Sequence, residues 1–204
     1  MKIKQRTIIQ PLIPHFKTIE KEGRLDQANG VRKDKKSAVC FGAHLAYVNS
    51  DDPMPHHEDP MSHHKGKNLF AEKLGISTVQ LTHMLEVCGA YHDPFGVDEW
   101  HHPPSCVLER MARMQVPTHK EIAESYLDTY AKTDLAQTTD DPSLLETLAD
   151  DDNDEVRYAV VNNKKTKLNT LIAIAEKRNE FDYILRVARI NIEHKHSTPE
   201  AEVG

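Results

Sequence analysis

Cysteine is scarce in this sequence, and the spacing of the cysteines excludes a fold stabilised by disulfide bonds. The 204 residues include three cysteines, Cys40, Cys88 and Cys106. An odd number at wide, irregular spacing forms no disulfide framework, no C-x-x-C pair and no iron–sulfur run. We therefore expect free thiols in a reducing compartment.

Long apolar runs are missing as well. The apolar patch near the N-terminus is short and is interrupted by Pro11 and Pro14. No other stretch is long or apolar enough to cross a membrane. The sequence predicts neither a signal peptide nor a membrane partner, and we expect a cytoplasmic protein.

Positive charge does not dominate the chain. Lysine and arginine number 26 against 32 aspartates and glutamates, which gives a formal net charge of -6. This balance argues against wholesale wrapping of nucleic acid but leaves room for a local basic face. With 38% hydrophobic and 28% charged residues, the sequence indicates solvated loops around one domain or two small ones.

No complete catalytic signature is present. The sequence has no Gly-rich phosphate loop and no hydrolase serine elbow. His92-Asp93 is a pair used by metal phosphohydrolases, but Pro94 follows and breaks the helix that those enzymes need there. We expect neither enzymatic activity nor a cofactor.

What the sequence does contain is helical periodicity in its C-terminal third. Asp141 followed by Pro142 predicts a helix start, Asn162-Asn163 predicts a helix end, and Thr166 is expected to cap the next helix. Each helix is too short to stand alone, so the helices must stack to bury their apolar stripes. The stripes consist of Leu144, Leu145 and Leu148; Val156, Ala159 and Val160; Leu168, Leu171, Ile172 and Ala175; and Phe181, Ile184, Leu185 and Ala188.

The run LLETLADDDNDEVRYAVVNNKKTKLNTLIAIAE, from Leu144 to Glu176, resembles leucine-rich-repeat-variant and HEAT-like helical repeats. The similarity extends to about Ile192. Leu148-Ala149 and Ile174-Ala175 occupy equivalent places, which gives a period of roughly 26 residues. The resemblance implies a curved scaffold that binds other macromolecules, here without the iron–sulfur cysteines of some relatives. About two repeats fit, fewer than a self-sufficient solenoid needs.

The rest of the chain predicts a helical N-terminal unit over residues 1–132, so that the fold class is mainly α. Ile3 to Ile9 predicts one short β-strand, and residues 49–67 predict a long loop rich in histidine and proline. A linker is expected at 133–140, the repeat unit at 141–193 and a disordered tail at 194–204. Further helices are expected at residues 15–22, 37–48, 69–74 and 78–87, after an N-cap at Ser105, and after a Thr118–Glu121 capping box with Ile122, Tyr126 and Tyr130 on one face.

The segment Cys40-Phe41-Gly42-Ala43-His44 gives a second, looser resemblance. With Leu74–Ser77, Pro94–Gly96 and Trp100, it is similar to small uncharacterised phage and bacterial helical proteins. This resemblance implies no activity.

The leading functional interpretation is a non-enzymatic adaptor that binds another protein through its repeats. The binding residues are expected to be exposed at the turns and helix ends of the repeat unit. They are Asp152, Asp154, Arg157, Asn162, Lys164 and Lys165.

A helix-turn-helix over residues 69–87 is the alternative. Ala71 allows close helix approach and Gly75 suits the turn between the helices. The second helix would offer polar groups to DNA, although it carries no arginine or lysine of the kind that reads bases. These groups belong to Ser77, Thr78, Gln80, Thr82 and His83.

A weaker alternative is a zinc-stabilised or metal-dependent protein. The chain has 13 histidines, several of them in adjacent pairs, and Cys88 is four residues from His92. Adjacent histidines point in different directions, which favours solvated loop residues over ligands. The candidate ligands are His56, His57, His63, His64, Cys88 and His92.

Overall fold

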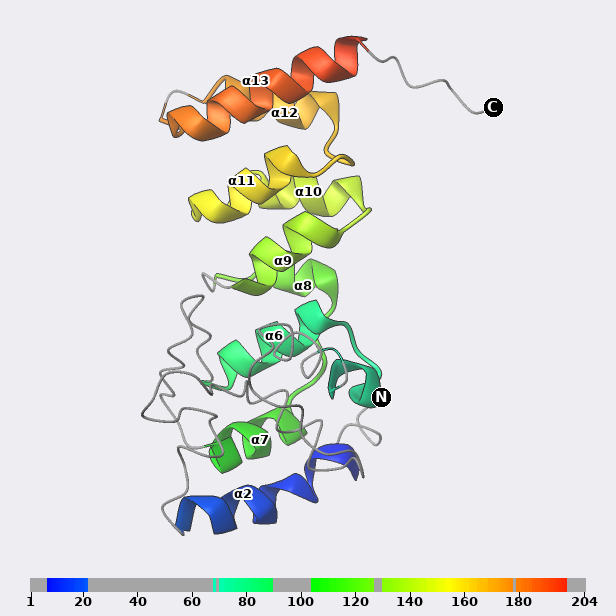
Figure 1. Cartoon of the computed structure of the whole chain (residues 1–204), viewed down its shortest axis with the longest axis vertical. Helices are drawn as coiled ribbons and strands as arrows, with labels where there is room; N and C mark the ends of the chain where they lie inside the picture. The colour runs from blue at the N-terminus through cyan, green and yellow to red at the C-terminus, as the bar shows by residue number, and fades with distance from the viewer. Residues whose placement is uncertain are drawn as a thin grey trace, which may run out of the picture. The chain divides into compact units, whose positions relative to one another are not determined.

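The structure is a computed structural model of the chain. It describes residues 7–21, 68, 70–89, 104–126, 130–177 and 179–197. The chain divides into two compact units, a first unit of Met1–Pro117 and a second unit of Thr118–Gly204. The fold is mainly α, as the sequence predicts (Figure 1). The predicted helix at 37–48 and the predicted loop at 49–67 lie outside the described residues.

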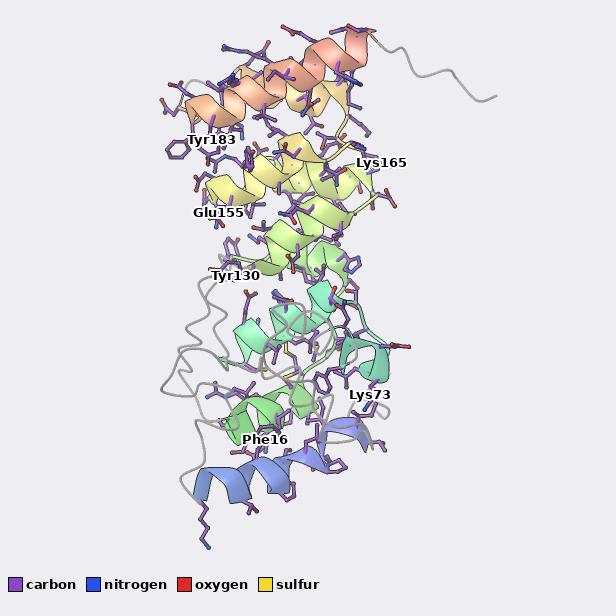
Figure 2. The ribbon with its side chains drawn as sticks, in the orientation of Figure 1. Phe16, Lys73, Tyr130, Glu155, Lys165 and Tyr183 are labelled. Atoms are coloured by element: carbon purple, nitrogen blue, oxygen red, sulfur yellow. The ribbon has the colours of Figure 1, made fainter. Side chains whose placement is uncertain are left out.

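Helices α2 (Leu12–Lys21), α6 (Thr78–Val87) and α7 (Pro104–Arg113) form the first unit together with a short helical segment around Phe70. Helix α7 packs against both α2 and α6. Phe16 is fully buried at the contact of α2 with α7 (Figure 2). One apolar core joins these elements; its buried members are Ile9, Leu12, Ile13, Phe16, Phe70, Ala71, Leu74, Leu81, Met84, Cys88, Val107, Leu108, Met111 and Ala112.

The β-strand expected at Ile3–Ile9 is wrong where the structure can be compared with it, because residues 7–9 are helical. Ile9, Leu12, Ile13 and Phe16 recur at i, i+3, i+4 and i+7 and are all buried, so they form one helical face. Pro11 lies in the turn before α2, and Pro14 lies in the first turn of α2, where proline is tolerated. The two prolines therefore do not interrupt that face.

The helices expected around Gly75 are confirmed. Residues 70–74 are helical, Gly75 has a positive φ of 70°, and α6 begins after the N-cap Ser77. A positive φ suits glycine, which has no Cβ to clash with the backbone. The expected N-cap at Ser105 is wrong, because α7 already begins at Pro104 and Ser105 is buried inside it. Proline is favoured at the first position of a helix.

The second unit contains, within its described residues, three successive helix pairs. These are α8 (His119–Ala123) with α9 (Tyr130–Thr138), α10 (Pro142–Leu148) with α11 (Asp154–Asn162), and α12 (Leu168–Ala175) with α13 (Asp182–Ser197). The second helices of the pairs pack on one another, α9 on α11 and α11 on α13 (Figure 1). Ala131, Leu135 and Ala136 on α9 occupy the places of Val156, Val160 and Val161 on α11, and all are buried.

Three boundaries expected from the sequence are corrected here. The linker expected at 133–140 is largely helix α9. Along the chain, the boundary between the two units falls between Pro117 and Thr118 and not near residue 132. Helix α8 ends at Ala123, so Ile122, Tyr126 and Tyr130 do not share a helix face, and Tyr126 is fully exposed. Helix α13 continues to Ser197, so residues 194–197 are helical and not a tail.

Caps fix the helix ends of the second unit. The Thr118–Glu121 capping box and the Asp141 N-cap are present as expected. The expected cap at Thr166 is wrong by one residue, because Lys167 is the N-cap of α12. Thr166 is instead buried, and its hydroxyl donates to the carbonyl oxygen of Val160 at the end of α11. None of the described helices is long and apolar enough to span a membrane.

Candidate functional site

Arg157 is a structural residue of the second unit. Its Nε and Nη2 donate to the two carboxylate oxygens of Glu180, at 2.6 and 2.8 Å. Its Nη1 donates to the carbonyl oxygens of Asp151 and Asp152, at 2.7 and 2.9 Å. The side chains of Arg157 and Glu180 are only 11% and 1% exposed. The expectation that Arg157 is an exposed binding residue is therefore wrong.

The charges of this pair stabilise each other. The hydrogen bonds from Arg157 hold the pKa of Glu180 below its usual value, and those to Glu180 raise the pKa of Arg157. A bidentate guanidinium–carboxylate pair is the strong form of a charge-assisted hydrogen bond. The pair therefore fixes the turn before α11 to the turn before α13.

Lys132 repeats this arrangement one helix pair earlier. It occupies on α9 the place of Arg157 on α11, and its Nζ lies 2.6 Å from a carboxylate oxygen of Asp151. Both side chains are less than a tenth exposed, at 7% and 8%. A cation on the second helix of each of these pairs thus binds a carboxylate from the next inter-helix turn.

Asparagine amides fix the other end of the second helices. Asn163 donates to the carbonyl oxygens of Ala136 and Thr139, at 2.7 and 3.0 Å. Asn191 donates to the carbonyl oxygen of Val161 at 2.6 Å. Ala136 and Val161 are equivalent positions, so each asparagine satisfies a carbonyl at the end of the preceding second helix.

Exposed aromatic rings gather where α11 and α13 begin. The ring centroid of Tyr183 lies 5.4 Å from that of Tyr158 and 5.8 Å from that of Phe181. The three residues are 44%, 41% and 53% exposed, in the same order. The Tyr183 hydroxyl donates to Asp154 at 2.6 Å. Partial burial and this hydrogen bond raise the pKa of Tyr183 to about 12. We call Tyr158, Phe181, Tyr183 and Asp154 the aromatic edge.

Further carboxylates surround the aromatic edge. Asp152 and Glu155 flank the start of α11, and Asp182 stands between Phe181 and Tyr183 in the sequence. All three residues are exposed. Figure 2 shows Glu155 and Tyr183 on the same side of the second unit and Lys165 on the opposite side. The exposed Arg186 follows Tyr183 by one helical turn on α13, so the surface around the aromatic edge carries this cation together with the three exposed carboxylates.

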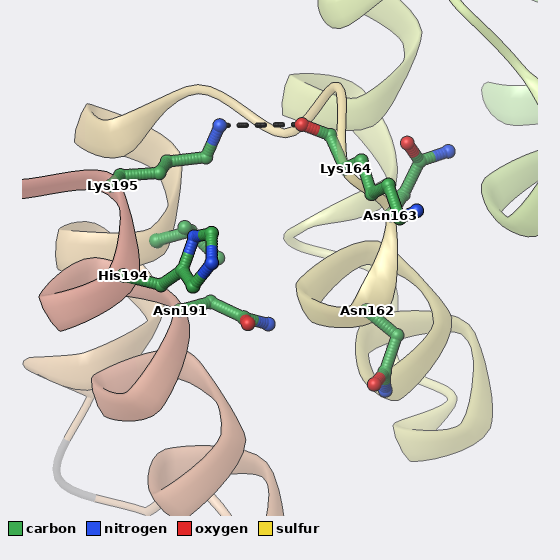
Figure 3. Close-up of a pocket in the computed structure, with 7 residues that line it drawn as sticks. Asn162, Asn163, Lys164, Asn191, His194 and Lys195 are labelled. Atoms are coloured by element: carbon green, nitrogen blue, oxygen red, sulfur yellow. Dashed lines mark hydrogen bonds between the residues drawn. The ribbon is translucent and has the colours of Figure 1, made fainter. Parts of the chain in front are cut away.

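Lysines gather at the far end of α11. Lys164 and Lys165 are exposed in the turn before α12, and Lys195 of α13 donates to the carbonyl oxygen of Lys164 at 3.2 Å (Figure 3). Lys167 pairs with Glu146 at 2.8 Å. We call Lys164, Lys165, Lys167 and Lys195 the lysine edge. Two cavities, of about 510 and 590 Å³, are lined by both Lys164 and Lys195.

The residues expected to bind a partner thus fall into separate groups. Asp152 and Asp154 lie at the aromatic edge, whereas Lys164 and Lys165 lie at the lysine edge. Asn162 is exposed near the lysine edge, and its amide donates to the carbonyl oxygen of Tyr158 within α11. The exposed rings of Phe181 and Tyr183 were not expected, because Phe181 continues the apolar spacing of the α13 stripe.

The residues expected to read DNA are largely engaged inside the first unit. The Ser77 hydroxyl and the Gln80 side chain form a reciprocal capping box, and Gln80 Nε2 also donates to the carbonyl oxygen of Pro117 at 2.6 Å. Thr82 and His83 are buried, and Thr78 is half-buried. The expectation that Thr82 and His83 face DNA is therefore wrong.

Among the candidate metal ligands, only Cys88 belongs to the described residues. Its thiol is buried 3.9 Å from the sulfur of Met114, and burial raises its pKa to about 11. A raised pKa disfavours the thiolate that zinc requires. His56, His57, His63, His64 and His92 lie outside the described residues. In the part that the structure describes, no three His, Cys, Asp or Glu side chains form a metal-binding group.

No family model matches this chain, and neither the curated proteins nor the solved structures contain a match to it. The resemblance to leucine-rich-repeat-variant and HEAT-like repeats stays a prediction.

Proposed function

We propose that this chain is a non-enzymatic interaction protein, whose aromatic edge binds a positively charged segment of another protein. The observation that carries the proposal is a group of three exposed rings, in which Tyr183 contacts both Tyr158 and Phe181 and donates to the Asp154 carboxylate. Single exposed apolar residues are ordinary on protein surfaces, but a contiguous group with a polar rim is typical of interaction sites.

The chemistry of the aromatic edge favours a cationic partner. Aromatic side chains contribute a large contact area at low entropic cost, and tyrosine is enriched at binding hot spots. Lysine and arginine side chains can stack on exposed rings and pair with carboxylates such as Asp152 and Glu155. These carboxylates would also steer a basic segment toward the rings.

Preorganisation supports the same proposal. Glu180 precedes Phe181 directly, accepts a hydrogen bond from its backbone N–H at 3.0 Å, and is itself held by Arg157. Tyr183 is held by Asp154 at the start of α11. A surface whose rings are already ordered loses less conformational entropy on binding.

A peptide selection tests the proposal. The full chain, immobilised, is used to select from a random displayed peptide library, in parallel with a Tyr158→Ser/Tyr183→Ser variant. The control is Tyr126→Ser, which removes a fully exposed tyrosine outside the aromatic edge. We expect enrichment of Lys- and Arg-rich peptides by the wild type and by the control, but not by the double variant. Enrichment of acidic peptides, or enrichment that the double variant retains, would contradict the proposal.

A further inference from the structure

The lysine edge brings together cations from segments that are distant in the sequence. Lys164 and Lys165 come from the turn after α11, Lys167 is the N-cap of α12, and Lys195 comes from the last turn of α13. Lys195 reaches back 31 positions to the carbonyl oxygen of Lys164. Folding thus concentrates positive charge on a chain whose net charge is -6.

Nearby carboxylates balance only part of this charge. Glu146 pairs with Lys167, Asp141 lies close enough to Lys167 to interact with its charge, and Asp140 lines the larger cavity. The four lysines of the lysine edge therefore outnumber these three carboxylates by one. Like charges held together raise the local positive potential, and binding an anion relieves their repulsion.

The lysines of the lysine edge line two cavities. The smaller, of about 510 Å³, also has Asn162, Asn191 and His194 in its wall (Figure 3). The larger, of about 590 Å³, is lined by Lys165 and Lys167 in addition to the shared lysines. Volumes of roughly 300–1,000 Å³ are typical of small-ligand sites. Lysine ammonium groups supply hydrogen-bond donors to both cavities.

We infer that the lysine edge is a second binding site, for a compact ligand that carries at least two phosphoryl groups. Lysine is a compact point charge that binds phosphoryl oxygens without a fixed bidentate geometry. Two neighbouring cavities that share Lys164 and Lys195 suit two linked anionic groups. A long nucleic acid fits less well, because Asp140 and Glu146 lie beside the lysines and the chain is acidic overall.

Isothermal titration calorimetry with inorganic tripolyphosphate at low salt tests the inference on the full chain. The test variant is Lys164→Ala/Lys165→Ala, and the matched control is Lys120→Ala/Arg186→Ala, which removes two exposed cations elsewhere in the second unit. We expect the test variant to weaken binding at least about tenfold and the control less than about twofold, because only the former removes charge beside the ligand. Circular dichroism establishes that both variants are folded.

A second pair of titrations identifies the source of the phosphoryl groups. Phosphatidylcholine vesicles containing a bisphosphorylated phosphoinositide are compared with the soluble headgroup alone. Binding to both through Lys164 and Lys165 indicates a lipid headgroup, and binding to the soluble form alone indicates a free ligand. Either result supports the site.

Three results would overturn the inference. They are no binding of tripolyphosphate, an equal loss in the test and control variants, and tighter lysine-dependent binding of a polyglutamate peptide. The Tyr158→Ser/Tyr183→Ser variant should bind tripolyphosphate normally, so failure at the lysine edge is distinguishable from failure at the aromatic edge.

Discussion

Arg157 on α11 and Glu180 before α13 form a bidentate ion pair, with N–O distances of 2.6 and 2.8 Å. Lys132 on α9 and Asp151 before α11 form the equivalent pair at 2.6 Å. Each pair joins the second helix of one helix pair to the inter-helix turn of the next. Helices of this length are only marginally stable in isolation. The two ion pairs and the apolar contacts between helices therefore stabilise the second unit.

Replacing Arg157 should lower the stability of the second unit. Arg157→Ala leaves the buried Glu180 carboxylate without its partner, and we expect the free energy of unfolding to fall by about 3 kcal/mol. Urea denaturation followed by circular dichroism measures the change. The matched control is Arg186→Ala on the exposed face of α13, which should change the free energy by less than about 0.5 kcal/mol. Equal effects of the two substitutions would show that the buried pair contributes no more than a surface charge.

The same pair predicts a pH dependence of stability. Because Arg157 lowers the folded-state pKa of Glu180 below its ordinary value of 4.5, the pair stabilises the fold fully above that value. The stabilisation is lost as the pH falls through the folded-state pKa. The difference in unfolding free energy between the wild type and Glu180→Gln should therefore shrink below pH 4.5. A difference that stays constant from neutral pH to pH 3 would contradict this assignment.

Asn162 and Asn163 are adjacent but should respond differently to substitution. The Asn163 amide satisfies carbonyls at the end of α9, whereas the exposed Asn162 bonds only within its own helix among the described contacts. Asn163→Ala should cost roughly 1–2 kcal/mol of unfolding free energy, because two half-buried carbonyl oxygens lose a donor. Asn162→Ala should cost less than about 0.5 kcal/mol. Thermal or urea denaturation compares the two, and the reverse order would refute the role of Asn163.

Cys88 should be slow to react. Its pKa, raised by burial from 9.0 to about 11, leaves roughly 100-fold less thiolate at pH 8 than an ordinary thiol has. We expect iodoacetamide to modify the half-buried Cys106 before Cys88 in the folded chain. Peptide mass spectrometry after timed quenching measures both rates in a Cys40→Ser background. Faster labelling of Cys88 would mean that the core around it opens readily.

Local signals explain which parts of the second unit could be predicted. The N-cap Asp141 with Pro142, and the asparagines after Val161, mark helix ends within a few residues of sequence, so α10 and α11 were predictable. Helix α9 was not, because Thr133, Asp134, Gln137 and Thr138 give the segment the polar composition of a linker, and Lys132 lies on its buried side. That lysine is tolerated only because Asp151 reaches it from 19 positions away.

The candidate sites depended still more on contacts between distant residues. Arg157 looks exposed in the sequence because its partner, Glu180, is 23 positions further on in a turn. Phe181 fits the apolar spacing of α13, yet it precedes the helix, so its ring is not carried toward the core. Apolar periodicity predicts which face of a helix is buried, but it does not predict whether a side chain just before the helix is buried or exposed.

Chemical-shift mapping of the full chain by NMR tests the central claim most directly. A Lys- and Arg-rich peptide from the selection is titrated into ¹⁵N-labelled protein, and the shifted amide resonances are assigned. The account predicts that the shifts concentrate at Asp152–Tyr158 and Phe181–Tyr183 and are absent from the Tyr158→Ser/Tyr183→Ser variant. Shifts confined to the lysine edge or to α2, α6 and α7, with the aromatic edge unchanged, would contradict it.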